Sequence, residues 1–139
     1  MMEHAEHSPA AIREKAAGAV NCQSVTLPSG LTVLCRTMPG YSSVHAMYAT
    51  NFGSVVREFT LKGKRIQLPA GTAHFLEHKM FESEQGDAFD LYAKTGAAAN
   101  AFTSYDRTCY IFTATGMTDE NLDILLNMVG HPWFTKETI

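Results

Sequence analysis

The sequence predicts an α+β fold in two layers, in which helices cover one face of a largely antiparallel sheet. Three observations predict it. Runs of alternating apolar and polar residues, typical of strands, come first. Two helical segments follow, and then a second pair of alternating runs precedes a last helix. Strands and helices do not alternate as strand–helix–strand units, so a parallel sheet is not expected.

The first part of the chain favours strands. Residues 1–23 are expected to form an N-terminal segment, with Ser8 and Pro9 at the N-cap and first position of a short helix. In residues 23–39 two alternating runs flank the sequence Pro-Ser-Gly, which predicts a hairpin. Residues 43–59 predict a strand, on which His45 is expected to be a hydrogen-bonded structural histidine.

Residues 60–71 are charged and contain glycine and proline, which predicts a loop. From Thr72 the periodicity becomes helical, and we expect Thr72 to cap a helix that ends near residue 80 or 81. A second helix is predicted with Asp87 as its N-cap and Gly96 as its left-handed stop.

Residues 100–115 predict a β-hairpin around a turn at 105–107. The last clear helix is expected to end at Gly130 and to bury a single apolar stripe. That stripe comprises Leu122, Leu125, Leu126 and Val129. Residues 134–139 resemble the start of another helix.

Composition excludes several classes of partner. With 139 residues and 45% hydrophobic content, the chain is long enough for one domain with a core. The net charge of −3 and the scattered lysines and arginines predict neither a nucleic-acid partner nor a membrane partner. Three cysteines without a C-x-x-C motif predict neither a disulfide framework nor a cysteine-ligated zinc. We therefore expect a cytoplasmic protein, and we assign no role to His4 and His7.

The stretch "GTAHFLEHKMFE" carries the chemistry. His74 and His78 are four residues apart, so on a helix both imidazoles can reach one metal ion. Glu77 lies within the same arc of about 100°. Zinc held by neutral imidazoles lowers the pKa of its bound water, and a carboxylate beside it can take the proton as that water attacks a carbonyl. Glu77 is therefore expected to be a general base and not a ligand.

A plain core helix is the alternative. In that case Phe75, Leu76 and Phe81 would bury the helix together with two histidines and a carboxylate. Ionisable groups are costly to bury without partners. The sequence thus favours the metal site but leaves a structural zinc, or no metal at all, open.

The motif and the following "GDAFDLYAKTGAAANAFTSYDRTCYIFTAT" resemble the insulysin/pitrilysin family of zinc metallopeptidases, the inverzincins, in which H-x-x-E-H reverses H-E-x-x-H. The likeness is to bacterial half-size members related to the mitochondrial processing peptidase. The resemblance implies an N-terminal metallopeptidase domain, incomplete over residues 24–139, in which one zinc ion is bound by His74 and His78 with Glu77 as the base.

The resemblance also implies a substrate site. Asn100, Ala101 and Phe102 match the family's edge strand, which pairs with an extended peptide as an added antiparallel strand. From the residues alone this segment is an ordinary hairpin strand with Phe102 in the core, and Cys109 on the neighbouring strand is expected to serve packing.

Zinc in a catalytic site normally has three protein ligands, and the motif supplies two. By resemblance the third is a glutamate on a helix beyond Ile139, and a second clamshell domain is also absent. Asp119 and Glu120 are better placed as first-turn acids of a helix, and Glu137 lies at the start of the last one. We therefore expect a zinc endopeptidase that, as this chain alone, hydrolyses little.

Two further expectations concern partners. A homo- or heterodimer with a family member would complete the clamshell. The alternative function is that of a non-catalytic peptide-binding or structural subunit of the same family.

Overall fold

The computed structural model describes residues 13–14, for which only the backbone is considered, and residues 22–137. The short helix predicted at Ser8 and Pro9, and the histidines His4 and His7, lie outside these residues. The chain divides into two compact units, residues 1–41 and 42–139.

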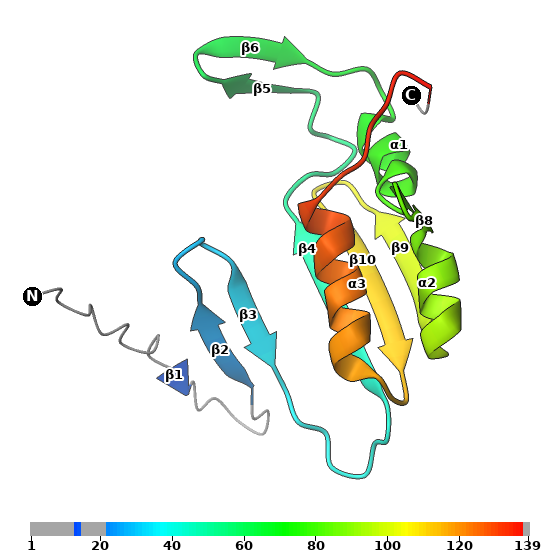
Figure 1. The fold of residues 1–139 in the computed structure, drawn as a ribbon. Helices are drawn as coiled ribbons and strands as arrows, with labels where there is room; N and C mark the ends of the chain where they lie inside the picture. Colours follow the sequence, from blue (N-terminus) through cyan, green and yellow to red (C-terminus); the bar gives the residue numbers. More distant parts are fainter. Residues whose placement is uncertain (1–12, 15–21, 138–139) are drawn as a thin grey trace, which may run out of the picture. The chain divides into compact units, whose positions relative to one another are not determined.

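The first unit contains three short antiparallel strands (Figure 1). Strand β1 (Arg13–Glu14) pairs with β2 (Gln23–Thr26), which pairs with β3 (Thr32–Cys35). The predicted Pro-Ser-Gly hairpin is confirmed. Gly30 occupies the left-handed region at φ 89°, a conformation that glycine adopts without steric cost.

The second unit is built on a three-stranded sheet of order β4-β10-β9, comprising β4 (Val44–Thr50), β10 (Thr108–Ala114) and β9 (Ala98–Thr103). Both pairings are antiparallel. Three helices, α1 (Thr72–Lys79), α2 (Ala88–Thr95) and α3 (Thr118–Gly130), lie over one face of this sheet (Figure 1). The predicted α+β class with helices on one face is therefore confirmed.

The core lies between the sheet and the helices. On the central strand the predicted alternation holds, with Tyr110, Phe112 and Ala114 facing the helices. They pack with Phe81, Ala88, Tyr92, Leu125 and Met128. On the opposite face of the sheet Nδ1 of His45 lies 3.0 Å from Oγ1 of Thr113, as expected of a structural histidine. Cys109 is buried, in keeping with a packing role.

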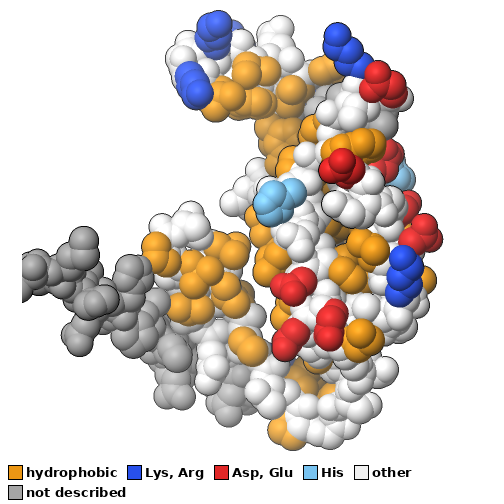
Figure 2. All heavy atoms as spheres, in the orientation of Figure 1, with side chains coloured by type: hydrophobic (Ala, Val, Ile, Leu, Met, Phe, Trp, Pro, Cys, Tyr) orange, Lys and Arg blue, Asp and Glu red, His pale blue; other side chains and the backbone are white. Residues whose placement is uncertain are grey.

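The prediction of a loop at residues 60–71 was largely wrong. Strands β5 (Glu58–Leu61) and β6 (Lys64–Gln67) form a hairpin, in which Phe59 pairs with Ile66. Lys62 and Gly63 both have positive φ, as a two-residue hairpin turn of type I′ requires. The charged residues obscured the alternation of side chains with a period of two that is typical of a strand. Figure 2 shows Lys and Arg side chains at the end of this hairpin beside its hydrophobic ones.

The helix ends test the capping predictions. Asp87 caps α2 by accepting a hydrogen bond from the Phe89 N–H at 2.8 Å, and Gly96 ends the helix at φ 72°, both as predicted. Thr72 is not an N-cap. Gly71 holds that position at φ 83°, and the Thr72 hydroxyl instead donates to the Pro69 carbonyl. Between α1 and α2 the chain forms a minimal ladder of β7 (Glu82–Ser83) and β8 (Gly86–Asp87).

Helix α3 ends at Gly130 as predicted, and Asp119 and Glu120 occupy its first turn. Its buried stripe differs from the prediction, because Asn121, Leu125 and Met128 face the core while Leu126 is 49% exposed. The helix expected from residue 134 is not seen as far as Glu137, where the chain has only a turn.

Candidate metal and peptide site

Helix α1 positions the three residues of the motif. The left-handed Gly71 turns the chain into the helix, and the Thr72 hydroxyl donates to the Pro69 carbonyl at 2.8 Å. Residues 72–79 then form two turns of helix, so residues three and four apart lie above one another. The helix is short and weakly amphipathic, and its place is set by contacts with β9 and β10.

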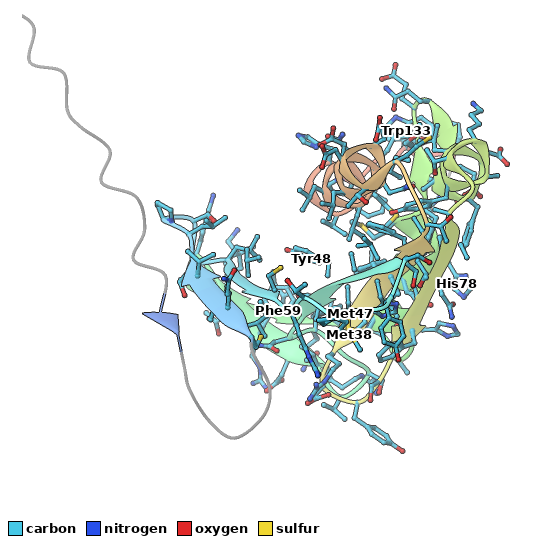
Figure 3. All side chains as sticks on the ribbon, turned by 90° about the horizontal axis from the view of Figure 1, so that it is seen from below. Met38, Met47, Tyr48, Phe59, His78 and Trp133 are labelled. Atoms are coloured by element: carbon cyan, nitrogen blue, oxygen red, sulfur yellow. The ribbon has the colours of Figure 1, made fainter. Side chains whose placement is uncertain are left out.

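His74 and His78 converge as their spacing predicts. Their Nε2 atoms lie 3.0 Å apart and their ring centroids 4.8 Å apart, and both side chains are exposed. Two nitrogens bound to one tetrahedral zinc at about 2.0–2.1 Å would be separated by about 3.3 Å. The two imidazoles therefore fit a shared ion with a shift of a few tenths of an ångström. Figure 3 shows His78 projecting from the outer side of the second unit.

Glu77 does not point the same way as the histidines. Its side chain is only 8% exposed and lies between α1 and the sheet, where Oε2 accepts a hydrogen bond from Oγ1 of Thr103 at 2.5 Å. The carboxylate is thus fixed on the sheet side of α1 and shielded from water. Phe75, predicted to help seat the helix, is instead 48% exposed, because it lies on the side of α1 away from the sheet.

An apolar cavity of about 290 Å³ lies along the inner side of α1. Its walls come from the helix, from the sheet and from the segment after α3, and include Ala73, Leu76, Met80, Tyr48, Tyr110 and Phe134. Burial and, to a smaller extent, the negative charge of Glu77 together raise the pKa of Tyr110 to about 12. Tyr110 therefore stays protonated at neutral pH, so it adds no second negative charge near Glu77.

Strand β9 forms one edge of the sheet, since among the described residues it pairs only with β10. The Ser104 N–H donates to the Arg107 carbonyl across the hairpin end. From there inter-strand bonds alternate, so Phe102 and Asn100 point their N–H groups toward β10. The N–H groups of Thr103, Ala101 and Ala99 face the free edge.

The three residues assigned to peptide binding therefore differ in what they can offer. Ala101 presents main-chain groups at the free edge, where its N–H donates to Oδ1 of the adjacent Asn100 at 2.8 Å. Phe102 is not in the core but 42% exposed, on the face away from the helices. Ala99 and Thr103 also present their main-chain groups at the free edge, but they were not among the residues predicted to bind a peptide. The alternation along the strand would have identified them once the position of the hairpin turn was known.

Among the described residues, two candidate metal ligands converge, His74 and His78, and no third side chain joins them. Within residues 22–137 no cluster of three or more His, Cys, Asp or Glu side chains could hold a metal ion. Asp119 and Glu120 lie in the first turn of α3, where the sequence predicted them, and do not form a cluster with the two histidines. Among the same residues, no helix has the length and apolar character needed to cross a membrane.

Comparison with known proteins gives a consistent family. Residues 67–139, just over half of the chain, match the family described as Insulinase (Peptidase family M16). The chain is 41% identical over 115 residues to the uncharacterized zinc protease YmfH of Bacillus subtilis (strain 168), a match that covers 81% of this chain and 27% of that protein.

Solved structures agree. A crystal structure named for an M16-like peptidase from Alicyclobacillus acidocaldarius matches with a TM-score of 0.81 and 37% identity, over 88% of this chain and 29% of the other. Pitrilysin shares the fold, with a TM-score of 0.64 and 22% identity over 91% of this chain and 13% of its own. The chain thus spans about a quarter of the length of the curated relatives it matches.

Proposed function

Since the chain belongs to the insulinase family of peptidases, peptidase family M16, we propose that its site is part of a zinc metalloendopeptidase that hydrolyses extended peptides. One observation carries the proposal. The Nε2 atoms of His74 and His78 face each other at 3.0 Å, and Glu77, on the same helix, has its carboxylate fixed by the hydroxyl of Thr103.

His74 and His78 would hold the zinc ion through Nε2, one ion for each complete site, with the remaining protein ligand coming from outside the described residues. When bound, zinc supplies a Lewis acid and lowers the pKa of water in its coordination sphere. Glu77 accepts the proton of the attacking water and returns it to the leaving amine.

The free edge of β9 binds the substrate. An extended peptide laid antiparallel against Ala99, Ala101 and Thr103 receives main-chain hydrogen bonds that do not depend on its sequence. Asn100 must release the Ala101 N–H before a peptide can use it. The exposed ring of Phe102 gives the sheet an apolar surface beside this edge.

Completion of the site depends on more protein than this chain. The relatives that are named zinc proteases are about four times as long as the part matched here. We therefore propose that the 139-residue chain alone hydrolyses little, and that another domain or a family member completes the site. The cytoplasmic location and the exclusion of nucleic-acid and membrane partners stay predictions from the sequence.

The test is Glu77→Gln in the full-length protein that carries this chain. Removing the base while keeping the shape should lower kcat for an extended peptide by about 100- to 10,000-fold, with one zinc per site retained. Glu84→Gln, an exposed change seven residues further along, is the matched control and should leave kcat unchanged. Full activity of Glu77→Gln would contradict the mechanism.

The same variant separates the enzyme from a non-catalytic subunit. Peptide binding to Glu77→Gln can be measured calorimetrically with and without a chelator. Binding that survives the chelator, in a wild-type protein without peptidase activity, would favour a subunit that only adds a peptide strand to β9.

A further inference from the structure

Glu77 is tied to the sheet by one side chain. The hydroxyl of Thr103, on the free-edge strand β9, donates to Oε2 of Glu77 at 2.5 Å, and the two residues are 26 positions apart in the chain. Glu77 is 8% exposed while His74 and His78 are exposed, so the carboxylate is the shielded member of the motif. Among the described residues, Thr103 is the side chain that donates a hydrogen bond to it.

The hydroxyl proton of Thr103 is available for this bond. Thr108 lies directly opposite Thr103 on β10, and its Oγ1 is 3.4 Å away. Thr108 gives its own proton to the Phe52 carbonyl at 2.7 Å. A threonine hydroxyl has a single proton. Thr108 therefore cannot donate to Thr103, and Thr103 is left to donate to Glu77.

The backbone next to Thr103 is held from two sides. The Ser104 N–H donates to the Arg107 carbonyl, and the Ser104 carbonyl accepts from the Ser54 N–H at 2.9 Å. Gly53 lies against the turn between β9 and β10, so close that a Cβ on residue 53 would meet the Tyr105 carbonyl oxygen at 2.5 Å. The donor is thus built into a fixed turn and not onto a mobile side chain.

We propose that Thr103 is a positioning residue for Glu77. Its hydroxyl holds Oε2, which fixes the plane of the carboxylate and leaves Oε1 to take the proton of the attacking water. The inference rests on the proposed function of Glu77 as the base. Strand β9 would then both pair with the peptide and position the base, because Thr103 presents its backbone to the free edge and its side chain to Glu77.

The experiment compares Thr103→Val, Thr103→Ala and Thr103→Ser in the full-length protein. Valine and alanine remove the donor, and we expect kcat to fall by about 10- to 100-fold, because small misplacements of a catalytic group have effects of this size. KM for an extended peptide and the zinc content should be unchanged. Serine keeps the donor and should restore most of kcat. Thr113→Val, the same change on the other face of the sheet, is the matched control.

A second measurement does not depend on turnover. In crystal structures of the zinc-free variants, Glu77 should leave its contact with β9 when residue 103 is valine or alanine and keep it when residue 103 is serine. The alanine and serine variants decide the question if valine prevents folding.

Two outcomes would overturn the inference. One is an unchanged kcat in the valine or alanine variant, and the other is a serine variant as slow as the alanine one. If Glu77→Gln is inactive while Thr103→Ala is fully active, only the role of Thr103 fails. If Glu77→Gln is fully active, the proposed function itself fails.

Discussion

Helices α1 and α2 have the same length, eight residues, and pack on the same face of one sheet, yet they are built differently. Helix α2 has a side-chain N-cap at Asp87, a left-handed glycine at its end, and buries Ala88 and Tyr92. Helix α1 has no side-chain cap and buries Glu77 and Lys79, while Phe75 is exposed. Helix α2 thus has the end caps and the apolar buried face that stabilise a helix, whereas α1 lacks a side-chain cap and buries charged residues.

The departure has a local cause. Glu77 and the two histidines occupy three of the eight positions of α1, so an apolar stripe cannot run the length of the helix. Buried polar groups must be paired, and both are: Glu77 with Thr103, and Lys79 with Glu82. Helices that carry a site often break local rules and are compensated by their surroundings.

The largest expected effect tests where the stability lies. Tyr92→Ala removes a ring that is 1% exposed and packs against Phe112, so we expect a loss of about 3 kcal/mol in the free energy of unfolding. Phe75→Ala on α1 removes a ring that is 48% exposed and should cost less than about 0.5 kcal/mol. Urea unfolding compares the two. Equal losses would mean that α1 is as much a part of the core as α2.

The same contrast explains how far the sequence could predict the molecule. Asp87, Gly96 and the spacing of His74 and His78 depend on local geometry alone, and the structure has them as expected. The bond from Thr103 to Glu77 depends on where α1 rests on β9, which no local pattern encodes.

Two other failures have different causes. The hairpin of residues 58–67 was missed because its charged residues hid a period of two. Asn121 was missed as a core residue because an asparagine is not expected there. It is buried because its side chain accepts from the Thr95 hydroxyl at 2.6 Å and donates to the Met117 carbonyl at 2.8 Å, which joins α2 to the start of α3.

A smaller effect per residue is expected at alkaline pH from two buried tyrosines, one in α2 and one on the strand β10 that α1 contacts. Burial raises the pKa of Tyr92, in α2, and of Tyr110, beside Glu77 of α1, from 10.0 to about 12. The unfolded chain releases these protons near pH 10, while the folded chain keeps them. The contribution of each tyrosine to the free energy of unfolding is therefore fully present below pH 10. It is lost as the pH rises toward 12, by on the order of 2 kcal/mol for each tyrosine.

Unfolding measured from pH 8 to pH 12 checks this dependence. Tyr92→Phe and Tyr110→Phe should each flatten the loss, and the double variant should remove most of it. Tyr105→Phe, at a ring that is 77% exposed, is the control and should leave the curve unchanged. A curve that is equally steep in the double variant would show that other groups cause the alkaline loss.

The smallest expected effect separates the two helix starts. Asp87→Ala removes the acceptor of the Phe89 N–H and should cost about 1 kcal/mol, the usual value of an N-cap. Thr72→Ala should cost less than about 0.5 kcal/mol, because the Thr72 hydroxyl donates to the Pro69 carbonyl and satisfies no N–H of α1. Thermal unfolding of the two variants can resolve this difference. An equal loss at Thr72 would mean that its hydroxyl stabilises the entry to α1 as strongly as a cap, and that α1 departs from α2 in its buried face alone.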